Sequence, residues 1–356
     1  MTKKKRTLEE ILSREKVLFY GIGNQFRDCL NIFEEQKNIF LFDSNKSGMY
    51  HGKYLIHAPE ELQNYYRNGD AVVISSIKNQ YEIAKYLVEE KHILSEDLFS
   101  YTSPVYEKRV YQPELIQKNQ EKIRKAYDLL EDEESKKYWE NSLLMRMTRQ
   151  PLYIQPNVNA ILLGEYKGVV ELEENDVIID CGAYIGDTAD IYINRLSGNC
   201  FVHALEPLRE NFLRLQENVR KNGWDNVKTY HCAVGEEEKK SMLYYEKEDF
   251  KMGVSFGTMA GSCCEEADIH TVDNLFMSLN KIDYLKMDIE GEEIKALHGA
   301  EKILKDKAPK LMISGYHRLS DFWEIPCLIN EINPAYKIYV GHAPGVSVEV
   351  EYYCRV

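Results

Sequence analysis

The sequence lacks the features that mark membrane-spanning and nucleic-acid-binding proteins. No apolar run approaches the ~20 residues that cross a bilayer, so we expect no membrane partner. The formal net charge of -13 provides no positive footprint for a nucleic acid, and we expect no such partner either. The basic residues 3–6 lead into a segment with two glutamates rather than into an apolar core, which argues against a signal peptide.

The cysteines form no metal-binding or disulfide pattern. The chain has eight of them, without a CxxC pair and without a histidine partner at zinc spacing. Cys263 and Cys264 are adjacent, which suits neither a chelate nor an ordinary disulfide. We therefore expect reduced thiols and a cytoplasmic protein.

What the chain does contain favours two α/β domains. Its 356 residues, of which 44% are hydrophobic, are enough to bury two cores. Within residues 1–110, short apolar runs that end near Gly21, Asp43 and Ser75 are separated by helix-like stretches. This βαβαβ pattern predicts a smaller Rossmann-like N-terminal domain. Residues 111–150 are charged and apolar at helical intervals, and they predict a helical connector.

Residues 151–356 alternate again between strand-like and helix-like segments. Residues 238–272 interrupt the alternation and are expected to form an inserted hairpin or loop. The tail 336–352 reads as two strands that add an antiparallel edge to the sheet. The candidate strands before it are residues 177–180, 201–205, 227–231, 282–287 and 310–314. This pattern predicts a larger Rossmann-like α/β domain at the C-terminal side of the connector.

The turn after the first of these strands carries the most informative residues. Asp180 ends an apolar run, Gly182 and Gly186 allow a tight turn, and Asp187 begins a helix-like segment. A second apolar run ends at Glu206, as in parallel sheets that bind a nucleoside-bearing cofactor at this edge. Two carboxylates in the turn would repel a pyrophosphate. They favour S-adenosylmethionine, which carries an ammonium and a sulfonium but no phosphate.

Each residue at this edge has an expected role. Asp180 would accept a hydrogen bond from the cofactor's ammonium group, either directly or through water, and Glu206 would accept both ribose hydroxyls. Small side chains after the third strand would let adenine lie against the backbone. The alternative role for Asp180 and Asp187 is that of a helix N-cap. The predicted cofactor-binding residues are Asp180, Gly182, Tyr184, Gly186, Asp187, Glu206, Pro207, Cys232 and Ala233.

The block at residues 286–293 completes a resemblance to a known family. Together with residues 177–188, 205–207 and 233–235, it resembles the FkbM family of S-adenosylmethionine-dependent methyltransferases, over roughly residues 170–320. The resemblance implies a class I methyltransferase fold and O-methylation, typically of a sugar or natural-product hydroxyl. It further implies that cofactor residues include Asp180, Gly182 and Glu206, and that pocket residues include Asp288 and Glu290.

Three residues that follow the last two candidate strands form the predicted catalytic group. Methyl transfer to a hydroxyl needs an aligned nucleophile, exclusion of water and a base. Asp288 and Glu290 would point to the same side of an extended chain. His317 titrates near neutrality and is the preferred general base. Asp288 is the alternative base or the partner that orients His317, and a hydrogen-bonded structural role is the other interpretation of His317.

The same region raises the question of a metal. Asp288, Glu290 and His317 could supply oxygen and nitrogen ligands to a divalent cation. No second Asp or Asn follows the strand 310–314, however, so no metal is expected. Glu292 and Glu293 are expected mainly to cap the next helix.

These features predict an S-adenosylmethionine-dependent O-methyltransferase that acts on a hydroxyl of a sugar-like small molecule or glycan. The alternatives are an N-methyltransferase and a non-catalytic ligand-sensing or assembly module with a vestigial methyltransferase domain. In the N-terminal domain, Gly21, Gly23 and Asp43 retain part of a nucleotide-binding fingerprint. They predict either a nucleotide or nucleotide-sugar ligand or a partner-docking domain, and both interpretations stay open.

Overall fold

The computed structural model describes most of the chain between residues 7 and 356. Residues 27–29 and 254–256 are described by their backbone alone. The segments outside the description are residues 1–6, 24–25, 34–35, 37, 77–78, 102–109, 158, 162–163, 246–253, 257–262 and 343–348. The chain divides into two compact units. Unit 1 comprises residues 1–120, 136–157 and 342–348, and unit 2 comprises residues 121–135, 158–341 and 349–356.

Unit 1 is built on a six-stranded sheet of order β3-β4-β2-β1-β5-β6. Its strands are β1 (Val17–Tyr20), β2 (Ile39–Phe42), β3 (Tyr50–His51), β4 (Tyr54–His57), β5 (Ala71–Ile74) and β6 (Leu98–Ser100). All pairs are parallel except β3 with β4. The central strands β1 and β5 are buried throughout, as their continuous apolar sequences require when both faces are covered. The predicted Rossmann-like pattern in this part of the chain is confirmed.

Short helices connect the strands of unit 1. They are α1 (Leu8–Leu12), α2 (Phe26–Ile32), η1 (Pro59–Glu61), α3 (Leu62–Tyr65), α4 (Gln80–Glu89) and η2 (Ser95–Asp97). The segment predicted as a connector forms α6 (Pro113–Lys118), α7 (Gln120–Asp128) and α8 (Glu133–Thr148), followed by η3 (Pro151–Tyr153). Proline at the first position of α6 is favourable, because that position needs no backbone donor. The residues of these helices divide between the two units.

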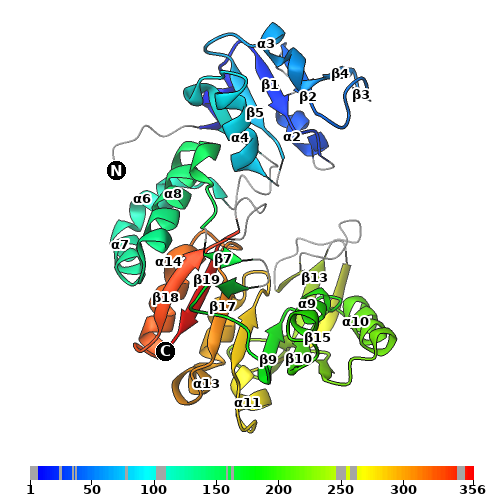
Figure 1. Ribbon diagram of the computed structural model, residues 1–356, viewed down its shortest axis with the longest axis vertical. Helices are drawn as coiled ribbons and strands as arrows, with labels where there is room; N and C mark the ends of the chain where they lie inside the picture. The colour runs from blue at the N-terminus through cyan, green and yellow to red at the C-terminus, as the bar shows by residue number, and fades with distance from the viewer. Residues whose placement is uncertain are drawn as a thin grey trace. The chain divides into compact units, whose positions relative to one another are not determined.

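Unit 2 contains a seven-stranded sheet of order β11-β10-β9-β16-β17-β19-β18 (Figure 1). Its strands are β9 (Asp176–Cys181), β10 (Cys200–Leu205), β11 (Val227–Tyr230), β16 (Tyr284–Met287), β17 (Lys310–Ser314), β18 (Lys337–Gly341) and β19 (Glu351–Arg355). Strand β19 runs antiparallel to β17 and β18, and the other pairs are parallel. The chain moves outward from β9 to β11 and then returns to the other side of β9 with β16. Ligands of open α/β sheets bind at such a reversal of strand order.

The helices of unit 2 follow these strands, and a smaller sheet interrupts them. The helices are α9 (Asp187–Arg195), α10 (Arg209–Asn222), α11 (Val272–Phe276), α12 (Glu293–His298), α13 (Glu301–Asp306) and α14 (Asp321–Ile332). The smaller sheet contains β12 (Ala233–Val234), β13 (Lys239–Tyr245), β14 (Val254–Phe256) and β15 (Cys263–His270), with the hairpin-like pairing predicted for residues 238–272. A two-stranded ladder pairs β7 (Ala160–Ile161) with β8 (Glu165–Tyr166).

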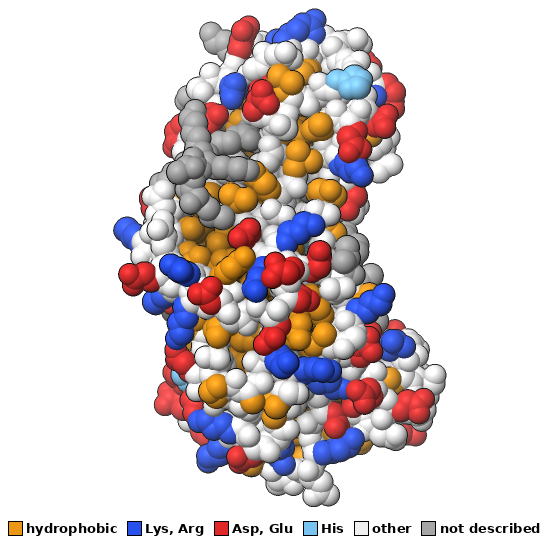
Figure 2. Space-filling model, turned by 60° about the vertical axis from the view of Figure 1, so that its left-hand side comes forward, with side chains coloured by type: hydrophobic (Ala, Val, Ile, Leu, Met, Phe, Trp, Pro, Cys, Tyr) orange, Lys and Arg blue, Asp and Glu red, His pale blue; other side chains and the backbone are white. Residues whose placement is uncertain are grey.

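Buried aliphatic and aromatic side chains form the core of unit 2. Ile178, Val202 and Tyr284 contribute from the sheet, and Tyr192 and Leu215 pack on it from α9 and α10. On the face shown in Figure 2, acidic and basic side chains are interspersed rather than gathered by sign. Across the part of the chain that the structure describes, no helix is at once long and apolar enough to traverse a lipid bilayer.

Candidate functional site

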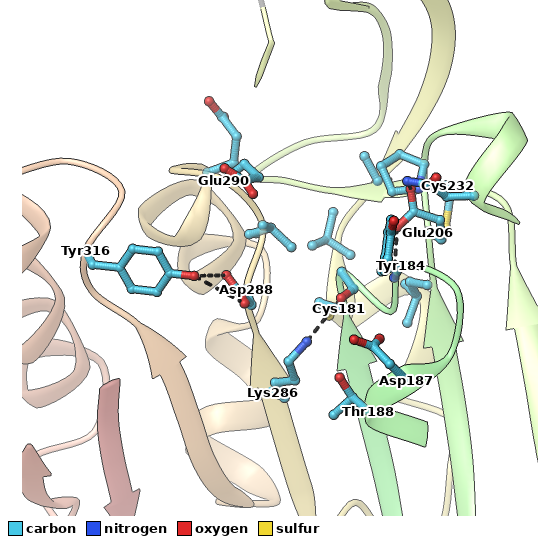
Figure 3. A pocket seen from close by; sticks show the side chains of 18 residues that line it. Cys181, Tyr184, Asp187, Thr188, Glu206, Cys232, Lys286, Asp288, Glu290 and Tyr316 are labelled. Carbon is cyan, nitrogen blue, oxygen red and sulfur yellow. Dashed lines mark hydrogen bonds between the residues drawn. The ribbon is translucent and has the colours of Figure 1, made fainter. Parts of the chain in front are cut away.

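A cavity opens at the carboxyl ends of β9, β10 and β16, where the strand order reverses (Figure 3). Glu206 and Cys232 lie on one side of this cavity, and Asp288, Glu290 and Tyr316 lie on the other. Seven of the nine predicted cofactor-binding residues line it: Gly182, Tyr184, Asp187, Glu206, Pro207, Cys232 and Ala233. The two that do not line it are Asp180 and Gly186. Of the predicted catalytic group, Asp288 and Glu290 line the cavity and His317 does not.

The turn between β9 and α9 owes its shape to left-handed backbone positions. Gly182 has a φ of 85°, and a Cβ atom there would collide with the carbonyl oxygen of Asp288. Gly186 has a φ of 91° and occupies the N-cap position of α9. Tyr184 adopts a φ of 49°, which is uncommon for a residue with a side chain and recurs at functional sites. Glycine is therefore required at residue 182 by both its φ and its neighbour.

Glu206 accepts hydrogen bonds from two backbone amides and one side chain at the cavity. The backbone amide of Tyr184 donates to its Oε2 over 3.0 Å, and the amide of Leu208 donates to its Oε1 over 2.9 Å. Asn211 Nδ2 adds a longer bond of 3.4 Å to Oε1. Burial raises the pKa of Glu206 to about 7, although these donors act in the opposite direction. The carboxylate is thus held in one orientation at the end of β10. A group that accepts hydrogen bonds from the cofactor's ribose hydroxyls is expected at this position.

Asp180 lies beneath the cavity rather than on its surface. Its Oδ1 is 2.8 Å from Lys286 Nζ, and that ammonium also donates to the carbonyl oxygen of Gly182 over 3.0 Å. The side chains of Asp180 and Lys286 are 0% and 7% exposed. Burial raises the pKa of Asp180 although Lys286 acts in the opposite direction, and burial would lower the pKa of Lys286, which Asp180 and then Asp288 raise overall. These shifts point in different directions for the pair, and the 2.8 Å contact between the two groups favours the ionic form. This position does not favour a direct bond from Asp180 to a cofactor ammonium.

Lys286 is a site residue that the sequence analysis did not assign. It lines the cavity from β16 and ties the β9 turn to that strand. Its partner Asp180 is 106 positions away in the chain, so their pairing depends on the parallel contact of β9 with β16. The sequence did contain a signal for this residue, because Lys286 is the first residue of the block at 286–293 that carries the family resemblance. Pairing of buried acids with cations makes such a lysine the expected partner of a strand-end acid.

The predicted catalytic residues come together at the ends of β16 and β17. Tyr316 donates its hydroxyl proton to Asp288 Oδ1 over 3.2 Å. His317 Nε2 lies 3.5 Å from Asp288 Oδ1 and 3.5 Å from Glu290 Oε2. Glu290 adopts a left-handed φ of 58°, beside Gly291 at 98°. This turn brings Asp288 and Glu290 to the cavity, while His317 lies behind them with only 3% of its side chain exposed.

Glu293 belongs to this cluster as well as to the start of α12. Its side chain is fully buried, and its Oε1 accepts from the backbone amide of Ile289 over 2.9 Å. The same oxygen lies 3.0 Å from His317 Nδ1. Burial alone would lower the pKa of His317, but the carboxylates around it, Glu293 first, raise it to about 9. At neutral pH the ring therefore carries a proton in this arrangement, which does not favour its predicted role as general base.

Glu292 and Glu293 differ in what they contact, although both were predicted mainly as caps. Glu292 stands at the N-cap position of α12 without a side-chain capping bond. Its carboxylate pairs with Lys295 at 2.6 Å and with Arg318 at 2.9 Å. Glu292 lines the cavity, whereas the carboxylate of Glu293 lies beside the buried His317.

In unit 1, the Asp43 carboxylate accepts hydrogen bonds from backbone amides of two loops. Its Oδ2 accepts from the amide of Ile22 over 2.8 Å, and its Oδ1 accepts from the amides of Asn45 and Lys46 over 2.8 and 3.1 Å. Asp43 thus fastens the loop after β1 to the loop after β2. The residues at positions 24–25 of the predicted glycine turn lie outside the described part of the chain. A nucleotide ligand in this unit stays a prediction.

Comparison with known proteins identifies the part of the chain that carries the cavity. Residues 180–335 match the family model described as the methyltransferase FkbM domain. The crystal structure of methyltransferase FkbM from Methylobacillus flagellatus KT is 19% identical, with a TM-score of 0.69 over 97% of this chain and 92% of that chain. This likeness extends through both units and shows a shared fold.

More distant structures resemble only part of the chain. Aeropyrum pernix fibrillarin, solved with bound S-adenosyl-L-methionine, is 13% identical over 53% of this chain and 70% of its own, with a TM-score of 0.35. Precorrin-6y C5,15-methyltransferase from Geobacter metallireducens GS-15 is 12% identical over 52% of this chain and 82% of its own, also with a TM-score of 0.35. No curated protein matches the sequence.

Proposed function

We propose, from the premise that residues 180–335 are an FkbM methyltransferase domain, that this protein transfers a methyl group to a hydroxyl of a sugar-like small molecule or glycan. S-adenosylmethionine is the expected methyl donor. The observation that carries the proposal is the arrangement of acids in one cavity at the strand reversal. Glu206 lies on one side of it and Asp288 and Glu290 lie on the other.

The residues of the cavity fit this donor chemically. Carboxylates at Asp187 and Glu206 suit a ligand with cationic groups and a ribose diol, whereas they would repel phosphates. Cys232 and Ala233 leave room for a flat ring beside the backbone. When bound, S-adenosylmethionine supplies an electrophilic methyl group on a sulfonium. Glu206 would hold its ribose, and Lys286 would keep the β9 turn in the shape that the ligand requires.

The opposite side of the cavity would bind and deprotonate the acceptor. Asp288 is one-third exposed and held by Tyr316, so it can accept the proton of an acceptor hydroxyl as the new O–C bond forms. Glu290 lies near it and can accept a hydrogen bond from a second hydroxyl. Two neighbouring acceptors of this kind suit a sugar diol better than a single hydroxyl. His317 Nε2 lies 3.5 Å from a carboxylate oxygen of each acid and would help to hold both at this side of the cavity.

A screen of acceptors tests the proposal. Wild-type protein is incubated with methyl-labelled S-adenosylmethionine and a panel of sugars, nucleotide-sugars, glycans and amines, and the products are identified by mass spectrometry. We expect label on a hydroxylated acceptor. The Asp288→Asn variant should lower kcat at least about 100-fold, because a positioned base contributes about that much. Asp190→Asn, an exposed position on α9, is the matched control and should retain full activity.

Two results would contradict this function. Label on an amine, with turnover unchanged in Asp288→Asn, would identify an N-methyltransferase that needs no base. Binding of neither donor nor acceptor by a folded protein would favour the alternative of a non-catalytic module.

A further inference from the structure

Tyr184 occupies a backbone position that costs free energy for a residue with its side chain. Its φ of 49° lies in the left-handed region, where an aromatic residue is an outlier and glycine or asparagine is favoured. The same turn has glycine at residues 182 and 186, with φ values of 85° and 91°. A strained tyrosine between two such glycines, in the wall of a ligand cavity, indicates that its side chain has a task in binding.

Tyr184 lies on the donor side of the cavity. Its side chain is half-buried and lines the cavity, and its backbone amide donates to Glu206 Oε2 over 3.0 Å (Figure 3). Glu206 is expected to hold the ribose of the donor. In S-adenosylmethionine a single methylene group joins the sulfonium to that ribose, so a side chain that begins beside the ribose acceptor is within reach of the positive sulfur.

The other tyrosine in the cavity wall has a different set of contacts. Tyr316 donates its hydroxyl proton to Asp288 Oδ1 over 3.2 Å, and its ring packs on His317 with the ring centroids 4.2 Å apart. Both contacts place Tyr316 on the acceptor side. Among the described residues that line the cavity, Tyr184 is therefore the tyrosine on the side of Glu206.

A sulfonium is a cation that has no hydrogen to donate. The ammonium group of the same cofactor differs in this respect, because carboxylates can bind it through hydrogen bonds. A carboxylate oxygen in contact with the sulfonium could also displace the thioether sulfur from the methyl carbon, which would turn the acid into a methyl ester. The face of an aromatic ring attracts such a cation without a hydrogen bond and without a nucleophilic atom.

We propose that the ring of Tyr184 binds the sulfonium of S-adenosylmethionine by a cation–π contact, and that this contact distinguishes the charged donor from its neutral product, S-adenosylhomocysteine. The contact is present with the donor and is lost once the methyl group has left, because the thioether product carries no charge at sulfur. The inference deepens the proposed function and rests on it for the identity of the donor.

Calorimetric titration of the full chain with S-adenosylmethionine and, separately, with S-adenosylhomocysteine measures this preference. Tyr184→Leu removes the ring but keeps an apolar side chain at the same left-handed position. We expect it to weaken S-adenosylmethionine binding about 5–30-fold, the range of a cation–π contact, and to change S-adenosylhomocysteine binding less than about twofold. Tyr184→Phe keeps the ring face and should retain both affinities within about threefold. Tyr50→Leu, at an exposed tyrosine of unit 1, is the matched control and should change neither affinity.

Equal losses for the charged and the neutral ligand in Tyr184→Leu would overturn the contact, because they would show a loss of shape alone. If Tyr184→Leu does not fold, Tyr184→Asn decides by the same comparison, since asparagine adopts the left-handed conformation more readily. Equal losses together with methyl transfer to a hydroxyl would leave the proposed function standing. A selective loss for S-adenosylmethionine, with no hydroxyl methylated by wild type, would leave the contact standing and overturn the proposed function. No binding of S-adenosylmethionine by folded wild type would overturn both.

Discussion

The buried ion pair between Lys286 and Asp180 gives the sharpest prediction about stability. Replacement of Lys286 by Met keeps most of the side-chain volume but leaves the carboxylate of Asp180 without its cation. The two charges are 2.8 Å apart and their attraction is about 6 kcal/mol at an effective dielectric constant of about 20. Desolvation offsets much of this attraction while both partners are present. Removal of one partner of such a pair costs about 3–5 kcal/mol, which is the loss we expect for Lys286→Met.

A double-mutant cycle isolates the pair. Asp180→Asn and the double variant Asp180→Asn/Lys286→Met are compared with the single lysine variant, and the double variant should be more stable than the sum of single losses by about 2 kcal/mol. Lys281→Met is the matched control. Lys281 pairs with Asp283 at the surface with half of its side chain exposed, so its loss should cost less than about 1 kcal/mol.

Urea denaturation provides the free energies. Trp224 and Trp323 belong to unit 2, and a Trp139→Phe background removes the tryptophan of unit 1, so fluorescence reports on the unit that holds the pair. A loss below about 1 kcal/mol for Lys286→Met, or strict additivity in the cycle, would refute the assignment of a buried ionic pair.

Two further predictions concern the donor side of the cavity. Because burial raises the pKa of Glu206 to about 7, its carboxylate is protonated as pH falls, and S-adenosylmethionine affinity should weaken about tenfold from pH 8 to pH 6. Calorimetry across this range should show the dependence abolished in Glu206→Gln and preserved in Glu210→Gln, an exposed acid of α10; a slope that survives Glu206→Gln would reject the assignment. Gly182→Ala should destabilise unit 2 by at least about 2 kcal/mol and weaken donor binding, since its left-handed φ leaves no room for Cβ. Gly223→Ala has a similar φ in open space and should cost about 1 kcal/mol, so equal losses in thermal unfolding would show that the collision at residue 182 is absent.

Sequence reasoning was sufficient for the architecture and for one side of the cavity. The five strand candidates of the larger domain correspond to β9, β10, β11, β16 and β17. Continuous apolar runs between segments with helical periodicity are typical of buried parallel strands, so the sequence was enough to locate them. The residues after β9 and β10 follow from local turn chemistry. Gly182 and Gly186 take the left-handed conformations that their positions require, and Glu206 directly follows β10 at the expected edge.

Partners that are distant in the chain could not be assigned in the same way. Asp180 was predicted as a ligand of the cofactor from the turn that its neighbours in sequence form, and this contact stays a prediction. The sequence did not reveal the partner that the structure gives Asp180, Lys286, on a strand that arrives 106 residues later. Glu293 was read as a cap because it begins a helix, although its buried carboxylate faces His317 on another strand end. The same contact changes the expected chemistry of His317. Both cases depend on which strands become neighbours, and periodicity carries no such information.

The central claim is that the acids at the strand reversal bind a cationic methyl donor. The most direct measurement is calorimetric titration of the full chain with S-adenosylmethionine and, separately, with NAD⁺, repeated with Glu206→Ala. We predict that S-adenosylmethionine binds at one site, that NAD⁺ gives no heat of binding, and that Glu206→Ala removes the signal. Binding of NAD⁺ in a manner that depends on Glu206, with none for S-adenosylmethionine, would contradict the account.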